Sequence, residues 1–216
     1  MIDMERRTED SRAARIARAS WIEPHHPRRH EAEAFIAERY HRAFGAALTR
    51  FFPHLLIFED VGGRIQAALG LRLAASQPLF LETYLDDPIE VEIGRRAGTQ
   101  PGRQRIVEIG NLAANQPGAA RDVIRSMTRL LQDADVRYVC FVATLPLRNA
   151  FRRLGLRPQG MTAADPGRLG DARSDWGSYY QHAPEVCFGD LETVAPDAFD
   201  AAEPSLVIAP CGATHP

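Results

Sequence analysis

Apolar residues recur at three- and four-residue spacing in the first quarter of the chain. The positions are Ile36, Tyr40, Ala43, Phe44, Ala47, Leu48 and Phe51. This spacing puts apolar side chains on one face of a helix, so it predicts an amphipathic helix over residues 30–51. Two β-prone runs follow at 55–58 and 65–73. The Gly-Gly pair between them is typical of a hairpin turn.

The second half of the chain alternates strand and helix patterns. Residues 106–113 predict a strand that Gly110 interrupts, and Pro117 suits the first turn of a helix with a buried apolar stripe. Residues 138–144 form a short apolar run, typical of a strand covered on both faces, and a further helix ends at Gly155. This order predicts an α/β (α+β) domain in which helices flank a mixed central sheet.

The two ends of the chain differ from the middle in composition. Residues 1–29 are rich in arginine, proline and histidine and lack periodicity, so we expect a flexible N-terminal arm. Residues 191–216 contain no arginine, and we expect an acidic, partly disordered tail. The folded domain is then expected to span residues 30–190.

Composition excludes several classes of function. All 26 basic residues of the 216 are arginine, which excludes lysine Schiff bases and lysine phosphate loops. The net charge of -2 gives no reason to expect a nucleic-acid partner. Cys140, Cys187 and Cys211 are too far apart for a metal or disulfide framework. The cysteine spacing therefore gives no reason to expect a bound metal. Because no long apolar run and no signal-peptide pattern are present, we expect no integral membrane span and a cytoplasmic protein.

Residues 105–121 carry the pattern that most resembles a ligand site. Gly110 inside a strand indicates a bulge, or close approach of another backbone or a ligand. The following loop and helix start offer N–H groups and the positive end of the helix dipole, where a pyrophosphate could bind at about 115–120. The alternative is an ordinary strand, loop and helix.

Glu108 is the strongest candidate for a functional carboxylate. Within a central strand it must be paired or hydrogen-bonded, and burial would raise its pKa and suit a general base that deprotonates an amine. The alternative is a structural ion pair with Arg72 or Arg39, either of which could also bind a substrate carboxylate. Asn111 follows the expected bulge, where its amide could hold a ligand or satisfy the bulged backbone.

Other side chains could contact an acceptor. Glu82, Asp86 and Asp87 could bind the cationic end of an amino substrate, although helix capping and turn formation are the commoner explanation for such residues. Four aromatic residues could wall an acyl pocket or form ordinary core. They are Tyr84, Trp176, Tyr179 and Tyr180.

The order of elements resembles the GNAT acyltransferase fold. In that family a bulged, splayed strand pairs with the pantetheine arm of acyl-CoA, and a loop Arg/Gln-x-x-Gly-x-Gly/Ala binds the pyrophosphate. Asn115, Gly118 and Ala120 resemble this loop, with asparagine in the first position, and Phe151 occupies the slot of the family's tyrosine acid. The resemblance implies the following donor contacts: Ile109, Gly110, Leu112, Ala113, Asn115, Gly118, Ala119, Ala120, Arg121 and Asn149.

A nearer resemblance is to acyl-homoserine-lactone synthases. Their helix RY..F resembles Arg39, Tyr40 and Phe44, and their strand G..RL resembles residues 70–73. Their E-x-x-R-x-A strand resembles residues 108–113, with asparagine in place of the arginine. The catalytic residues are then expected to be Glu108, Asn111 and Arg72. The expected substrate contacts are Arg39, Tyr40, Phe44, Glu82, Tyr84, Trp176 and Tyr179.

The nearest resemblance is to the bacterial family of thermostable hemolysins. It rests on ERYHRAFGA at 38–46, FFPHLL at 51–56, LGLR at 69–72, PLFLETYLDDPIE at 78–90, IVEIGNLA at 106–113 and WGSYY at 176–180. Together the resemblances imply an N-acyltransferase with acyl-CoA or the phosphopantetheine of acyl carrier protein as donor. The acceptor is expected to be the amine of a small amino-acid-like molecule. The alternatives are a membrane-damaging hemolysin and a catalytically inactive GNAT-like binding module.

Overall fold

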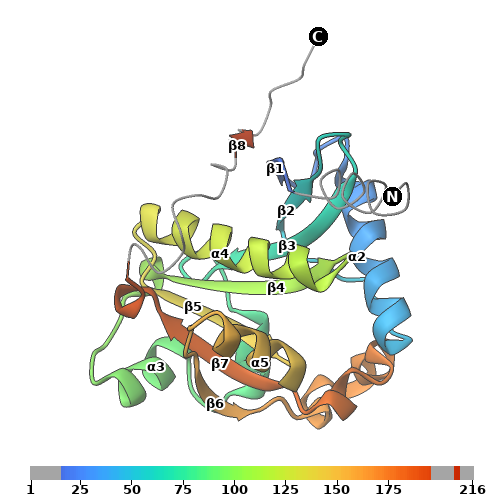
Figure 1. The fold of residues 1–216 in the computed structure, drawn as a ribbon. Helices are drawn as coiled ribbons and strands as arrows, with labels where there is room; N and C mark the ends of the chain where they lie inside the picture. The colour runs from blue at the N-terminus through green and yellow to red at the C-terminus, as the bar shows by residue number, and fades with distance from the viewer. Residues whose placement is uncertain (1–15, 196–206, 210–216) are drawn as a thin grey trace.

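The structure is a computed structural model that describes residues 16–195 and 207–209. Within these residues one eight-stranded sheet has the order β6-β7-β5-β4-β3-β2-β1-β8 (Figure 1). The strands are β1 (Arg18–Ile22), β2 (His54–Glu59), β3 (Ile65–Leu73), β4 (Ile106–Ala114), β5 (Tyr138–Ala143), β6 (Gln159–Ala163), β7 (Glu185–Asp190) and β8 (Val207–Ala209). The helices are α2 (Arg29–Phe44), α3 (Ile89–Ala97), α4 (Pro117–Asp133) and α5 (Leu145–Arg153). The predicted class, a mixed sheet flanked by helices, is confirmed.

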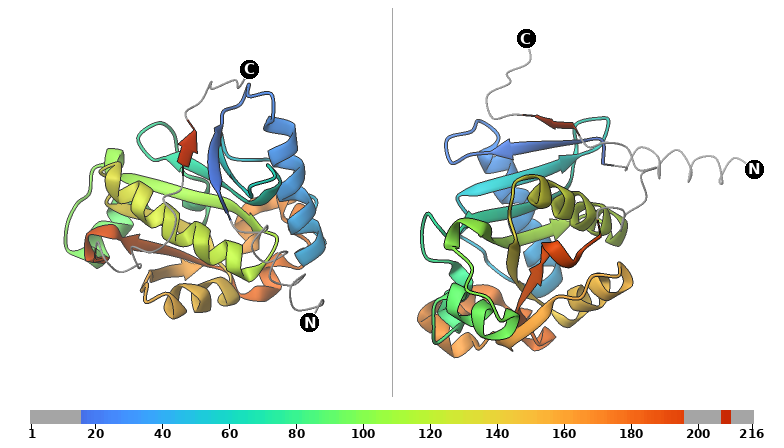
Figure 2. Two further views of the ribbon diagram at one scale, coloured as in Figure 1. Left: turned by 45° about the horizontal axis from the view of Figure 1, so that its top comes forward. Right: turned by 90° about the vertical axis from the view of Figure 1, so that its left-hand side faces the viewer.

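Helices cover both faces of the sheet (Figure 2). Ala67 and Leu69 of β3 pack with the inner side of α4, whereas Ala68 between them packs with α2. Phe141 of β5 packs against α5, whereas Cys140 packs with α3. Because side chains alternate along a strand, α4 and α5 share one face of the sheet and α2 and α3 share the other. We call these the α4–α5 face and the α2–α3 face.

The predicted hairpin is confirmed, and the predicted first helix is too long. In the turn between β2 and β3, the Asp60 carboxylate accepts the N–H of Gly62 (2.8 Å) and of Arg64 (3.1 Å). Helix α2 ends at Phe44 rather than near residue 51, because Gly45 adopts a left-handed conformation (φ 65°) and its N–H bonds to a carbonyl of the last turn. The apolar residues beyond it belong to a loop that packs on the sheet.

Strand β4 carries the predicted bulge. Gly110 pairs with Gly70 of β3, and the next pairs are Ala113 with Ala68, so β4 has one extra residue in this interval. Asn111 lies in it with φ 52°. The residue in the left-handed conformation is therefore the asparagine and not the glycine, which is consistent with the tolerance of asparagine for that conformation.

Beyond the bulge β4 leaves its neighbour on the other side. Its parallel pairing with β5 covers Ile106–Ile109 and then ends. The remaining residues of β4 up to Ala114 have no partner strand on the β5 side. The predicted splayed strand is thus present, and the backbone groups along its free edge need another partner.

The predicted flexible arm is wrong for the part that the structure describes. Residues 18–22 form β1, whose Ala19 and Ile22 are fully buried, and Ile16 packs in the core against α4. Five residues are too few to show periodicity, and the arginine-rich composition around them led us to predict a flexible segment instead of a strand. Residues 1–15 lie outside the described part. In the predicted tail, a 3₁₀ turn (η5, Leu191–Thr193) and the short β8 are described, and β8 pairs with β1.

Candidate active site

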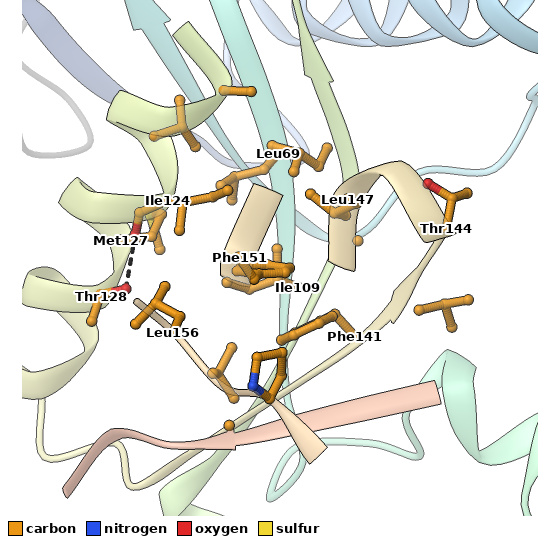
Figure 3. A pocket seen from close by; sticks show the side chains of 18 of the residues that line it. Leu69, Ile109, Ile124, Met127, Thr128, Phe141, Thr144, Leu147, Phe151 and Leu156 are labelled. Carbon is orange, nitrogen blue, oxygen red and sulfur yellow. Dashed lines mark hydrogen bonds between the residues drawn. The ribbon is translucent and has the colours of Figure 1, made fainter. Parts of the chain in front are cut away.

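A pocket of about 590 Å³ lies where β4 and β5 diverge. Figure 3 shows Ile124 and Met127 of α4 on one side of this space, Leu147 of α5 on the other, and Phe151 of α5 beside Ile109 between them. Ile109 of β4 lies on its floor. The few polar groups include Thr128, whose hydroxyl donates to the carbonyl of Ile124 (2.8 Å) and so is already satisfied. The walls therefore suit an apolar chain.

The pocket reaches through the sheet. Tyr40, Ala43 and Phe44 of α2 line it together with the residues of α4, although these helices cover opposite faces. Tyr179 of the 3₁₀ segment η4 (Tyr179–His182) also lines it. The gap between β4 and β5 thus connects the two faces of the sheet.

The start of α4 lies at the mouth of the pocket. Gln116 occupies the N-cap position with no side-chain capping bond, and Pro117 begins the helix. The first N–H groups of a helix have no partner within it, and they lie at the positive end of its dipole. Asn115 donates its side-chain amide to the carbonyl of Ile65 (3.0 Å), so that amide is a structural group. A Cβ at Gly118 would meet nothing within 4 Å, which leaves space above the helix start.

The predicted donor contacts divide between the pocket and its surroundings. Five of the predicted residues line the pocket: Ile109, Gly110, Leu112, Asn115 and Ala120. Five others do not: Ala113, Gly118, Ala119, Arg121 and Asn149. Ala113 and Ala119 belong to the packed core on either side of β4, and Asn149 lies on α5 outside the pocket. The donor role of every one of these residues stays a prediction.

Glu108 is buried on the α2–α3 face and is 2 % exposed. Its carboxylate accepts the N–H of Phe80 (2.7 Å) and of Leu81 (2.9 Å), the first residues of the 3₁₀ turn η1 (Phe80–Tyr84). Burial raises the pKa of Glu108 to about 7, although the two N–H groups and the charge of Arg72 act in the opposite direction. The predicted hydrogen-bonded carboxylate with a raised pKa is therefore present, beside the pocket rather than in its lining.

Neither arginine forms the ion pair with Glu108 that the sequence left open. Arg72 donates to the carbonyl of Pro78 (3.2 Å), and Arg39 pairs with Glu38 (3.4 Å). The Nε atoms of Arg39 and Arg72 are both buried without a hydrogen-bond partner. Because buried donors normally find acceptors, these two atoms are candidates for a ligand or a water.

Phe52, which the sequence pattern did not single out, holds the centre of the bulge. Its backbone N–H donates to the side-chain oxygen of Asn111 (2.9 Å), so the Asn111 amide fixes the loop before β2. A Cβ at Gly110 would lie 2.6 Å from Cζ of Phe52, and a Cβ at Gly70 would lie 2.6 Å from its Cβ. The close approach that the strand glycine predicted is therefore made by Phe52.

An aromatic cluster lies on the α2 side of the pocket. Tyr40, Phe44 and Tyr179 line the pocket, and the rings of Phe44 and Tyr179 lie 5.1 Å apart. Trp176 packs behind them, 5.1 Å from Tyr179 and 6.3 Å from Tyr40. Tyr84 lies further out, where its hydroxyl meets that of another tyrosine. Trp176 and Tyr84 are thus neighbours of the pocket and not part of its wall.

Glu82 serves as a structural cap. Its carboxylate accepts the N–H of Leu79 (2.7 Å) and of Ile89 (2.9 Å) and pairs with Arg103 (2.8 Å). Burial opposes ionisation, but the hydrogen bonds from Arg103 and from the two N–H groups outweigh it and lower the pKa of Glu82. Its neighbours Asp86 and Asp87 each pair with an arginine. The capping alternative therefore describes this segment, and a role for Glu82 in substrate binding stays only a prediction.

The far end of the pocket carries residues that the sequence analysis missed. They are Leu156, Arg157, Pro158, Gly189, Asp190, Leu191, Thr193 and Val194. These residues come from the segment before β6, the end of β7 and the turn η5 after it, where no periodic pattern marks a pocket. In the described part of the chain, no group of three or more His, Cys, Asp or Glu side chains could hold a metal ion. No helix there is long and apolar enough to cross a membrane.

Several solved structures share this fold. BjaI, a CoA-dependent acyl-homoserine lactone synthase solved with SAM and isopentyl-CoA, matches with a TM-score of 0.59 at 12% identity, over 88% of this chain and 92% of BjaI. FeeM, an N-acyl amino acid synthase from uncultured soil microbes, matches with a TM-score of 0.56 at 13% identity, over 82% and 92%. TofI, solved with an inhibitor and MTA, matches with a TM-score of 0.53 at 16% identity, over 81% and 91%. No curated protein matches the sequence.

At these identities the structures establish the fold, which is the GNAT-like fold of acyltransferases, and leave the reaction open. The sequence itself matches the family model described as thermostable hemolysin over residues 22–195. That match includes every strand and helix from α2 to β7. The chain therefore belongs to the thermostable hemolysin family.

Proposed function

We propose that the protein is an N-acyltransferase that moves an acyl group from acyl-CoA or acyl carrier protein to the amine of a small amino-acid-like acceptor. The observation that carries the proposal is the splay of β4 from β5, with an apolar pocket of about 590 Å³ in the gap. The free edge of a strand offers hydrogen-bonding groups to an extended amide chain such as pantetheine. The shared fold with BjaI and FeeM supports the same class of reaction.

The donor enters from the α4–α5 face in this proposal. Its pantetheine arm pairs with the free edge of β4 beyond Ile109, and its acyl chain lies between α4 and α5. The phosphates lie at the start of α4, where N–H groups and the helix dipole favour anions. Backbone N–H groups of the bulge near Asn111 stabilise the oxyanion that forms on the thioester.

The acceptor enters from the α2–α3 face. Glu108 takes a proton from its amine, and the nitrogen lone pair attacks the thioester carbonyl carbon. The tetrahedral intermediate collapses, the carbon–sulfur bond breaks, and the thiolate leaves and takes up a proton. The products are an amide and a free thiol, with no change of oxidation state. Holding both reactants in the gap supplies proximity, which contributes up to about 7–11 kcal/mol.

The test is to mix the purified full-length protein with acyl-CoAs and acyl carrier proteins of varied chain length and a panel of amino acids. Release of free thiol is followed together with the N-acyl product by mass spectrometry. The proposal predicts both products in equal amounts, and only when donor and acceptor are present together.

Two other results would replace the proposal. Tight donor binding without turnover by any pair would favour the inactive binding module, consistent with Phe151, which stacks on Phe141 (4.8 Å) in the slot of the tyrosine acid. Dye leakage from liposomes without any thiol release would favour membrane damage.

A further inference from the structure

Phe52 packs over Gly70 and Gly110, next to Arg72 and Glu108 on the α2–α3 face. In the register of β3 and β4, Arg72 is opposite Glu108 and Gly70 is opposite Gly110. Residues two apart on a strand share a face, so the two glycines lie next to Arg72 and Glu108, roughly 7 Å along the strands. Gly110 also lines the pocket. The side chain that covers the glycine pair, Phe52, therefore packs behind Gly110 of the pocket lining and against Arg72, the residue opposite Glu108.

That side chain is held from three directions. The two glycines bring it closer to the backbone than any other residue would, as the 2.6 Å positions of their missing Cβ atoms show. Asn111 accepts its backbone N–H at 2.9 Å. The guanidinium carbon of Arg72 lies 4.7 Å from the centre of its ring. With only 7 % of its surface exposed, the Phe52 side chain is held in one position by its neighbours.

The path of an acceptor follows from this position. Its nitrogen must reach the acyl carbon at the bulge near Asn111, while its proton passes to Glu108 on the other side of the glycine pair. Resting on the acyl transfer proposed above, we propose that Phe52 is a specificity-determining residue: its ring occupies the space above Gly70 and Gly110 and restricts the acceptor to amino acids with small side chains.

The experiment compares two phenylalanines of the same loop. Phe52→Leu removes the ring above the glycines, whereas Phe51→Leu changes a partly buried neighbour in the same apolar cluster. The probes are glycine and alanine as small acceptors and leucine and phenylalanine as bulky ones, with one acyl-CoA as donor. The readouts are kcat/KM for each acceptor and, separately, the affinity of each acceptor by calorimetry in the presence of CoA.

We expect Phe52→Leu to raise the bulky-to-small ratio of kcat/KM about tenfold or more, and Phe51→Leu to leave the ratio unchanged. Asn111→Gly is the second variant: it retains the left-handed conformation and the ring, frees the backbone N–H of Phe52, and shifts the ratio in the same direction. Thermal unfolding confirms that each variant is folded.

The two proposals fail in different ways. If the wild-type protein turns over acceptors and Phe52→Leu changes the ratio no more than Phe51→Leu does, the role of Phe52 is wrong and acyl transfer stands. If no donor and acceptor react but Phe52→Leu still changes the ratio of affinities, acyl transfer is wrong, and the role of Phe52 in selecting small ligands is supported. If neither ratio changes, Phe52 is an ordinary core residue.

Discussion

The two faces of the sheet use charge and space in different ways. On the α4–α5 face, apolar side chains of β4, β5 and both helices leave a pocket of about 590 Å³ open. On the α2–α3 face, the carboxylates of Glu59 and Glu108 are buried, and each is satisfied by arginines or backbone N–H groups. One face thus contains an open apolar pocket and the other contains buried charged groups. Strand β4 contributes to both faces, and they meet at its bulge.

This difference separates the consequences of substitution. Filling the open pocket removes room for a ligand while the packed core stays intact, so activity suffers and stability does not. Removing a charge from the other face leaves a partner buried without compensation, so stability suffers first. Glu108 is the exception, because the proposed reaction uses its carboxylate as the base.

The largest effect is expected from Glu108→Gln. A general base contributes about 10²- to 10⁴-fold, so kcat/KM falls by that range. Since the base must be ionised, wild-type kcat/KM rises with pH through about 7, the raised pKa of Glu108, and the variant loses this rise. The pH profile of kcat/KM over pH 5–9 tests this. Glu92→Gln, which removes a carboxylate of α3 that pairs with Arg95 and Arg96, keeps the rise.

Stability gives the same residue a second readout. The pKa of Glu108 is higher in the folded chain than in the unfolded chain, so between about pH 4.5 and 7 the native state binds more protons and stability falls as the pH rises. Glu108→Gln removes this fall. Denaturant midpoints measured across the window that change equally in both proteins would show that the carboxylate titrates normally.

The next effect separates the pocket from the core. Leu147→Trp fills the space between α5 and α4, and kcat/KM falls about 10²-fold because the donor is displaced. Leu145→Trp is the matched control on the same helix, since Leu145 is 47 % exposed and does not line the pocket. Both proteins melt close to the wild type. An equal loss of activity in both variants would mean that the pocket holds no substrate.

The third effect is on stability alone. Glu59 is fully buried and pairs with Arg28 (2.7 Å) and Arg18 (3.1 Å), which joins the start of α2 to β1. Glu59→Gln lowers the free energy of unfolding by about 2 kcal/mol, less than for a fully buried pair because both arginines reach solvent. Glu31→Gln removes an exposed partner of Arg28 and costs under about 1 kcal/mol.

Denaturant unfolding measures both variants, and acyl transfer per folded molecule stays at the wild-type level in each. A loss of activity in Glu59→Gln at a temperature where it is fully folded would contradict the separation of the two faces.

The smallest effect is at the start of α4. Arg121 is exposed at the start of the second turn of α4, and Arg121→Gln raises the KM for acyl-CoA about two- to fivefold at low salt, with the difference shrinking as salt is added. Arg173→Gln, in the 3₁₀ segment η3 (Pro166–Trp176) and outside the pocket lining, leaves KM unchanged. A change that is the same with dephosphorylated pantetheine donors would place the phosphates elsewhere.

Regular elements of the fold were predictable because each carries a local pattern. The Gly-Gly hairpin, the strand with Gly110, and the helix after Pro117 all form where periodicity and turn residues predict them. β1 was not predictable, because it is too short to show alternation and lies among arginines. The end of α2 at Gly45 was missed because apolar residues continue past it into a loop.

Site residues were predictable where a strand or helix pattern determines their position. They were not predictable where contacts between segments distant in the sequence determine it. The bulge, the raised pKa of Glu108 and the inner side of α4 follow from local sequence. Phe52 contacts glycines of two strands that come 18 and 58 residues later, and nothing in its own neighbourhood shows this. The hydrogen bond between Asn111 and the backbone of Phe52, and the far end of the pocket around residues 156–158 and 189–194, likewise depend on contacts between distant segments.

The most direct measurement of the central claim is a crystal structure with an unreactive acyl-CoA analogue. The account predicts an analogue whose pantetheine arm runs along the free edge of β4 from Gly110 to Ala114, with its acyl chain between α4 and α5 and its phosphates at the start of α4. An analogue bound at saturation on another surface, with the pocket between β4 and β5 empty, would contradict it.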